Sequence, residues 1–205
     1  MRHHFHLEGF NLKLRPVREG DAPFIVWLRN LDFVKGKVGD SAADVASQET
    51  WLKSYFERAG DYYFIVETLT GIPLGTHGIY DIVGTSAEKG RHIIRSEVMA
   101  GLPNEILMMD FAFQELGLSE LRSNHVSTNV NLYSLHRKCG FKQVGVKRGA
   151  QMVGGSPVDL VQYTLTTGDW SAVRDRLLPL AQLAGQHLLE WSKTQTTGRQ
   201  PWEGS

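Results

Sequence analysis

The sequence contains little cysteine, no long apolar run and no excess of charge. Cys139 is the only cysteine among 205 residues, so an internal disulfide is excluded. No apolar run approaches the roughly 20 residues of a membrane-spanning helix, and the N-terminus lacks the apolar segment of a secretory signal. Because 22 Lys and Arg balance 22 Asp and Glu, no global field favours nucleic acid. We predict a cytoplasmic protein that binds neither nucleic acid nor membrane.

The composition itself is that of an ordinary globular protein, with 41% hydrophobic and 21% charged residues. A chain of this length can bury one substantial core. We predict one domain over residues 1–168, a helical extension over 169–194 and a disordered end over 195–205. Three histidines among the first six residues lack a second ligand cluster, so they indicate a solvated end, and no metal site is expected.

The spacing of apolar residues alternates between the period of strands and that of helices. It predicts strands over residues 10–17, 62–68, 73–83, 92–99, 121–126, 141–148 and 158–165, and helices over 21–28, 47–58, 103–116, 129–138 and 169–193. The polar stretch 86–90 is interpreted as a turn. This order, βααβββαβαββ, predicts an α/β (α+β) fold: a mixed, mostly antiparallel seven-stranded sheet with helices on both faces and an extra C-terminal helix.

Motifs in the second half of the chain resemble the GNAT superfamily of N-acetyltransferases. Residues 110–118 read DFAFQELGL, which matches a buried helix ending in AF-x-x-LGL. A strand, Asn129 at the start of a helix, and a GF turn at Gly140-Phe141 follow in the family's order. The resemblance extends over roughly residues 11–166. It implies the GNAT fold, acetyl-CoA as co-substrate and transfer of the acetyl group by direct attack of an amine.

The loop expected to hold the CoA pyrophosphate departs from the family's usual Arg/Gln-x-x-Gly-x-Gly/Ala. Residues 98–105 read VMAGLPNE, without the basic residue and the second glycine. Together with Leu135-His136, this loop resembles a GNAT subgroup that acetylates amino groups of nucleotide-linked sugars in bacterial surface-polysaccharide pathways. Alternatives are acetylation of protein N-termini, as in the ribosomal-protein type, or of a small-molecule amine. An alternative of another class is a non-catalytic CoA-binding or interaction module.

The resemblance places the CoA pyrophosphate at the opening of the helix over residues 103–116. Unpaired backbone N–H groups and the positive end of the dipole suit an anion there, although an irregular loop before a core helix would look the same. Asn129, Tyr133 and His136, at i, i+4 and i+7, would share one helix face toward the ligand or toward the sheet. The predicted cofactor-binding residues are Val98, Met99, Ala100, Gly101, Leu102, Asn104, Asn129 and Tyr133.

Acetyl transfer needs a base for the ammonium proton and benefits from an acid for the leaving thiolate. Glu97 is the predicted base, because a carboxylate enclosed late in the fourth strand would have a raised pKa. His77 is the second candidate. His136 stands where many family members carry a Tyr acid, and Tyr133 is an alternative donor. Each could instead be a satisfied structural residue, and Cys139 is interpreted as small packing.

The predicted C-terminal helix lies outside the resemblance yet carries several large apolar residues. Leu177, Leu180, Leu188 and Trp191 are spaced along it. Such a surface usually needs a partner. We therefore expect this helix either to pack back on the domain or to form a homodimer contact.

Overall fold

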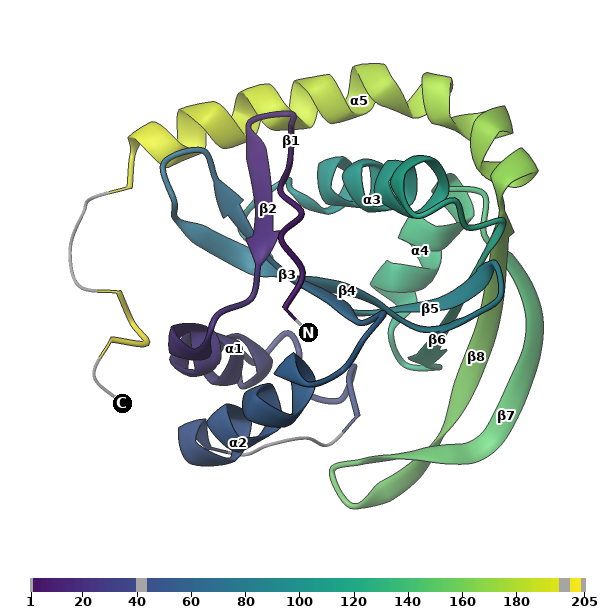
Figure 1. Cartoon of the computed structure of the whole chain (residues 1–205), viewed down its shortest axis with the longest axis horizontal. Helices are drawn as coiled ribbons and strands as arrows, with labels where there is room; N and C mark the ends of the chain where they lie inside the picture. The colour runs from purple at the N-terminus through teal and green to yellow at the C-terminus, as the bar shows by residue number, and fades with distance from the viewer. Residues whose placement is uncertain (1, 40–43, 196–199, 204–205) are drawn as a thin grey trace.

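The structure, a computed structural model, describes residues 2–39, 44–195 and 200–203 (Figure 1). Its strands are β1 (Leu7–Gly9), β2 (Leu12–Pro16), β3 (Tyr62–Thr68), β4 (Pro73–Val83), β5 (Ser86–Ile94), β6 (Glu120–Val126), β7 (Lys142–Val153) and β8 (Ser156–Thr166). Its α-helices are α1 (Ala22–Arg29), α2 (Val45–Phe56), α3 (Gly101–Asp110), α4 (Val130–Lys138) and α5 (Thr167–Lys193). A 3₁₀ turn (Glu19–Asp21) precedes α1, and a π-helical turn (Phe111–Glu115) extends α3.

All eight strands join one sheet in the order β1-β2-β3-β4-β5-β6-β8-β7. Each neighbouring pair is antiparallel except β5 and β6, which pair in parallel at only three positions, from Ser86 opposite Glu120 to Glu88 opposite Arg122. Beyond these pairs the two strands separate. The predicted mixed, mostly antiparallel sheet is confirmed, with one strand more than expected because β1 pairs with β2.

Helices cover both faces of the sheet, as predicted (Figure 1). On one face α1 and α2 pack on β3 through a core that includes Phe24, Leu52 and Ile65. On the other, α3 and α5 pack over β2, β3 and β4 around Phe64 and Phe111. Apolar side chains on both faces of β3 account for its nearly continuous burial.

The fourth strand was predicted in the wrong place. The sequence predicted it over residues 92–99 after a polar turn at 86–90, whereas β5 begins at Ser86 and ends at Ile94. The turn lies earlier, at Gly84, which has a φ of 59°. Polar residues of 86–90 are strand residues with partners: Ser86 Oγ donates to Glu120, and Glu88 accepts from Asn124. Polarity therefore did not mark a turn here.

The long helix α5 packs back on the domain. Trp170 Nε1 donates to Asp110 Oδ1 over 3.0 Å, and the guanidinium of Arg174 pairs with the same carboxylate. At Gly185 an added Cβ would lie 2.5 Å from the carbonyl oxygen of Phe10, so the close approach requires glycine. The helix continues through Pro179. None of the described helices has the length and apolarity that crossing a bilayer requires.

Both ends of the chain pack on the domain where the structure describes them. His3 Nε2 lies 3.1 Å from the carbonyl oxygen of Tyr63, and its ring packs 4.5 Å from that of Phe64, so the N-terminal histidines are not a wholly solvated end. In the segment expected to be disordered, Trp202 is buried with its ring 4.9 Å from Phe24. Residues 196–199 and 204–205 of that segment lie outside the described residues.

Candidate active site

Two cavities meet where β5 and β6 separate. The first, of about 280 Å³, lies between β5 and the starts of α3 and α4; Gly101, Asn131 and Leu135 line it. The second, of about 290 Å³, lies between the diverging strands and extends toward the β7–β8 hairpin. Six described residues line both cavities: Lys37, Val38, His92, Ile93, Asn129 and Leu132. Of these six, His92 is the only one with an imidazole, the side chain best suited to proton transfer.

A β-bulge in β5 determines where His92 points. Thr76 pairs with Ile93 and Gly78 with Gly90, so two residues of β5, Arg91 and His92, stand opposite the single residue His77. Arg91 adopts a positive φ of 53°, a costly conformation for a bulky side chain. The extra residue changes the alternation of β5, so that Lys89 and His92 both face α3 while Arg91 faces the opposite side.

The bulge is held by contacts of Arg91 on that opposite side. Its guanidinium donates to both carboxylate oxygens of Asp61 and lies 4.2 Å from the ring centre of Tyr80 and 5.0 Å from that of Tyr63. A bidentate ion pair and aromatic faces of this kind can stabilise a strained backbone conformation. The strand geometry that positions His92 is thus supported by a dedicated cluster.

On the side of β5 that faces α3, two side chains of β5 contact Glu105. Lys89 Nζ donates to Glu105 Oε1 over 2.6 Å, and His92 Nδ1 lies 3.1 Å from the same oxygen. The side chains of Lys89 and Glu105 are 1% and 0% exposed. Burial alone would raise the pKa of Glu105, but Lys89 and then His92 outweigh it and hold this pKa well below its ordinary value. A charged pair is therefore buried beside the cavities.

The histidines around this pair are neutral. Burial lowers the pKa of His92, and the nearby Glu105 carboxylate offsets this shift only in part. Burial lowers the pKa of His77 further still. Burial and then Lys89 lower the pKa of His136 to about 2. His136 Nε2 accepts a hydrogen bond from Lys89 over 3.1 Å, which fixes the lone pair on that nitrogen. Lys89, Glu105, His77, His92 and His136 are called the polar cluster below.

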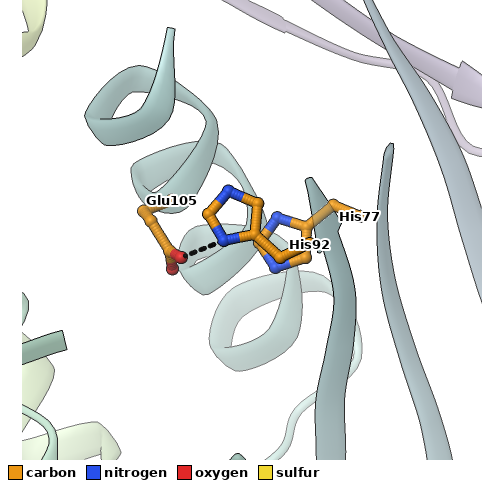
Figure 2. Close-up of side chains that lie close together, drawn as sticks. All are labelled: His77, His92 and Glu105. Carbon is orange, nitrogen blue, oxygen red and sulfur yellow. Dashed lines mark ion pairs between the residues drawn. The ribbon is translucent and has the colours of Figure 1, made fainter. Parts of the chain in front are cut away.

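The polar cluster does not have the geometry of a metal site. His77, His92 and Glu105, the side chains drawn in Figure 2, each offer a ligand atom, and these atoms lie within 4.8 Å of one another. However, the two imidazole rings are stacked, with centroids 4.4 Å apart and planes at 15°. A metal lies in the plane of each imidazole that binds it, and two nearly parallel planes cannot share one ion without turning a ring. The Lys89 ammonium beside Glu105 would also repel a cation.

The structure separates the predicted catalytic residues. Glu97 lies in the turn after β5, where its side chain is 45% exposed and pairs with Arg95, so the enclosed position that made it a candidate base is not found. His77 is fully buried, its Nδ1 2.9 Å from Asn104 Nδ2, and lines neither cavity. His136 with its pKa of about 2 has no charged form to donate from near neutrality. None of the three stands where the cavities meet.

Tyr133 lies away from both cavities. It is 39% exposed and lines a separate hollow with Ser134, Arg137 and Lys138. The expected common face with Asn129 fails because Asn129 is the cap of α4, with non-helical φ and ψ of −87° and 67°. Asn129 Oδ1 accepts from the backbone N–H of Leu132, and its Nδ2 donates to the carbonyl of Lys37. It therefore joins the helix to the loop that closes both cavities.

The predicted pyrophosphate loop is only partly oriented toward a cavity. Gly101 lines the first cavity, whereas Asn104 is buried against His77 and Met99 is 60% exposed. Ala100 is buried at the start of α3, and Val98 and Leu102 are partly buried against the core. Cys139 is buried and burial raises the pKa of its thiol, which fits the interpretation as small packing.

Three residues at the centre of the polar cluster were missed in the sequence: Lys89, His92 and Glu105. Lys89 lay in a presumed turn, and no alternation pattern anticipates a bulge. Glu105 did carry a signal, because it is a carboxylate in a helix expected to be buried on all sides. Carboxylates are almost never fully buried without a partner, so a search for that partner would have been justified.

Comparison with known proteins gives the family. Residues 11–142, more than half of the chain, match the model of the acetyltransferase (GNAT) domain. The chain belongs to the GNAT family of acetyltransferases. Members of this family are acyl-CoA-dependent N-acetyltransferases that use acetyl-CoA as acyl donor. No curated protein matches the chain significantly in sequence.

Solved structures agree with this GNAT fold. FdhC, described as a nucleotide-linked sugar GNAT, superposes with a TM-score of 0.70 at 24% identity, over 89% of this chain and 99% of FdhC. The spermidine N-acetyltransferase of Vibrio cholerae in complex with CoA and spermine has a TM-score of 0.71 at 19% identity, over 80% and 99%. A probable GNAT acetyltransferase of Chromobacterium violaceum has a TM-score of 0.69 at 20% identity, over 81% and 88%. At these identities the likeness shows the fold alone.

Proposed function

We propose that this acetyltransferase transfers an acetyl group from acetyl-CoA, by direct attack, to the primary amine of a nucleotide-linked amino sugar in surface-polysaccharide biosynthesis. The observation that carries this proposal is the charge of the second cavity. Arg29, Lys37, Lys89 and Arg91 line it, and the described residues of its wall include no Asp or Glu. Such a wall attracts an acceptor that carries negative charge near its amine.

The same charges argue against a polyamine acceptor. Lys89 and Arg91 have carboxylate partners in Glu105 and Asp61, but neither carboxylate lines the cavity. A polycation such as spermidine would meet guanidinium and ammonium groups without an acidic residue among the described wall residues to bind it. A nucleoside diphosphate would instead offer phosphate oxygens, which Arg and Lys bind well.

The first cavity fits the acyl donor. No described side chain caps α3, so the backbone N–H groups of Gly101 and Leu102 are available for pyrophosphate oxygens. The amide of Asn131, and that of Asn129 beyond its bonds to Leu132 and Lys37, line this cavity beside the apolar Leu132 and Leu135. Such a lining suits the arm of CoA, in which amide and methylene groups alternate. When bound, acetyl-CoA would supply an activated thioester. The chain's own residues would hold it and leave its carbonyl carbon open toward the second cavity.

A panel of acceptors tests the substrate class by the release of free CoA thiol. It contains a nucleotide-linked amino sugar, the same sugar without its nucleotide, spermidine, and a peptide with a free N-terminus. We expect the nucleotide-linked sugar to have a kcat/KM at least about tenfold above the free sugar, because a hydrogen bond to a charged group contributes about 1.5–3 kcal/mol. Equal rates for both sugars, or a preference for spermidine or the peptide, would refute the proposed acceptor. No thiol release with any amine would favour a non-catalytic module.

A variant of the cavity wall tests whether Lys37 contacts the nucleotide of the acceptor. Replacing Lys37 in the wall by Met should raise the KM for the nucleotide-linked sugar while leaving that for the free sugar unchanged. Lys53→Met on the outer face of α2 is the matched control, because Lys53 is exposed and lines neither cavity. An equal rise in KM for both sugars would show that Lys37 does not contact the nucleotide.

The cytoplasmic location and the homodimer remain predictions within this proposal. Although α5 packs back on the domain, Leu180 and Leu183 on its outer side are 54% and 51% exposed. We propose that a second copy covers them in a two-fold contact. Light scattering of Leu180→Glu and Leu183→Glu variants tests this: the dimer predicts a fall to the monomer mass, and an unchanged mass would contradict it.

A further inference from the structure

We infer that His92 is a catalytic residue that takes the proton which the amine nitrogen loses as it attacks the thioester, and that Glu105 is the residue that positions its ring. The inference rests on the acetyl transfer proposed above but not on the identity of the acceptor. His92 lines both cavities, so it stands where an amine from one would meet a thioester from the other. Its side chain is only 7% exposed, which keeps bulk water away from the imidazole.

The neighbours of His92 define the nitrogen that acts. Its Nδ1 lies 3.1 Å from Glu105 Oε1, so the carboxylate favours a proton on Nδ1 and leaves the lone pair on Nε2. Figure 2 shows Nδ1 directed toward Glu105 and Nε2 directed away from it. The charged and titratable groups around the ring come from each packed element: Lys89 of β5, Glu105 of α3, His77 of β4 and His136 of α4. Of these, Lys89 and Glu105 are charged.

The charges suit a group that starts neutral and becomes positive. Burial lowers the pKa of His92, so the ring is free to accept a proton near neutral pH. Once protonated, the imidazolium would lie beside the Glu105 carboxylate, which stabilises the new charge at a distance set before the reaction begins. Lys89 in turn keeps Glu105 ionised although it is fully buried. The bulge at Arg91 brings these three side chains to one face.

The proton and electron transfers of the step balance. The amine nitrogen bonds to the thioester carbonyl carbon, and the carbon–sulfur bond breaks with its electron pair leaving on the thiolate. His92 Nε2 takes the N–H proton that the nitrogen must lose to become an amide. The imidazolium then returns this proton to the thiolate or to water, which regenerates neutral His92. No oxidant or further reactant is required.

Other histidines do not meet these conditions. His77 lines neither cavity. His136 cannot act as a base toward a substrate, because the lone pair on its Nε2 accepts the hydrogen bond from Lys89. His125 lines the second cavity but not the first. His92 alone among the described histidines reaches the junction.

The pH dependence of His92→Gln tests the proton transfer. Glutamine keeps much of the volume but cannot accept the proton, so kcat near neutral pH should fall by about 10²–10⁴-fold, the usual contribution of general base catalysis. The neutral amine is the nucleophile in both proteins, so both profiles should rise toward the pKa of the acceptor amine. The additional fall of log kcat that wild type shows at acidic pH, as His92 becomes protonated, should be absent from His92→Gln. His187→Gln, at an exposed position of α5, is the matched control and should behave as wild type. A His92→Gln variant with wild-type rate and profile would overturn the inference.

Ligand binding by calorimetry and imidazole titration by NMR test the inference without relying on the reaction rate alone. Calorimetry should show acetyl-CoA binding to His92→Gln within about threefold of wild type, since the ring acts on the acceptor. In wild-type protein, NMR titration of the imidazole carbons should show neutral His92 at pH 7; a protonated ring would refute the inference. Glu105→Gln should move the His92 titration to lower pH and reduce kcat with little change in KM. An unmoved titration would show that Glu105 does not position the ring.

If His92→Gln does not fold, His92→Ala with added imidazole replaces it. Imidazole should restore activity to His92→Ala and leave wild type unchanged, and a folded His92→Ala that is already fully active would refute the inference. A failure of the role proposed for His92 can be distinguished from a failure of the proposed acceptor class. A wrong acceptor class appears as a low wild-type rate with the nucleotide-linked sugar, whereas a wrong role for His92 appears in the ratio of variant to wild type with whichever amine reacts.

Discussion

Helix α3 contacts two regions that are equally buried and chemically opposite. Its later turns carry Met108 and Met109 into an apolar core shared with β2 and β3. Its first turns carry Asn104 and Glu105 into the polar cluster, where every partner is a charged or titratable side chain. Burying charges and neutral imidazoles is costly, whereas apolar residues of similar volume would pack without that cost. The contrast is the one that the proposed role of His92 requires: the polar cluster would serve the reaction and the apolar core the stability of the fold.

The largest effect should come from leaving a charge in the polar cluster without its partner. Lys89→Met removes the cation that faces Glu105, and breaking a buried ion pair in this way typically destabilises by about 3–5 kcal/mol. Urea unfolding measures the loss. The double variant Lys89→Met with Glu105→Leu removes both charges and should recover most of the stability. A double variant no more stable than Lys89→Met alone would show that the pair itself is not the source of the effect.

Stability should also fall as the pH is lowered, because of the buried histidines. For His77, His92 and His136 the folded pKa lies below the unfolded value of 6.5, so below pH 6.5 the unfolded chain binds protons that the folded chain does not. The free energy of unfolding should then decrease by up to about 1.4 kcal/mol per pH unit for each histidine. For His136 this window extends down to about pH 2. Unfolding between pH 6.5 and pH 5 measures the slope, and it should become smaller in His136→Phe. A free energy of unfolding that does not change between pH 6.5 and pH 5 would mean that these histidines are not buried in the neutral form.

A moderate effect is expected beside the cluster, where α3 turns toward the apolar core. Ile106, the neighbour of Glu105, is 1% exposed in that core. Ile106→Val removes one methylene and should destabilise by about 0.5–1.5 kcal/mol. Because no titrating group is changed, the slope of stability with pH should equal that of wild type. A changed slope would show that the two regions are not separate in energy.

The smallest effect is expected at the residue that the sequence favoured as base. Glu97 is half exposed and pairs with Arg95 outside both cavities. Surface substitutions away from a site usually change free energies by less than about 0.5 kcal/mol, so kcat of Glu97→Gln should stay within about twofold of wild type. Steady-state kinetics with the best acceptor of the panel measures it. A fall of more than tenfold would restore Glu97 as a candidate base.

The sequence predicted most of the fold because helix and strand periods are local properties. The helices at 47–58 and 169–193 and the strands at 62–68 and 73–83 lie close to α2, α5, β3 and β4. The site was harder, since its geometry depends on β5, which ends at Ile94 and not at residue 99, so that Glu97 lies in the turn beyond the strand. Within the strand, the bulge opposite His77 shifts the alternation by one residue and moves side chains to the other face, so His92 was overlooked.

Asn129 and Gly101 were both expected to contact the cofactor. Both line the first cavity, and their contact with the cofactor stays a prediction. They belong to helix starts, which motifs locate well because cap residues and small residues have specific backbone roles. Lys89, His92 and Glu105 come together from a strand and a helix only through tertiary packing. No local sequence pattern predicts that these three side chains come into contact.

A crystal structure of the protein with bound CoA would test most directly whether the reaction takes place beside the polar cluster. We expect the terminal sulfur to lie in the first cavity at its junction with the second, next to His92 and Leu132. Reacting atoms must approach to about 3–3.5 Å, so an acetyl group on this sulfur would be within reach of an amine in the cationic cavity. A sulfur bound beside Glu97 at the surface turn, or turned away from His92, would contradict it.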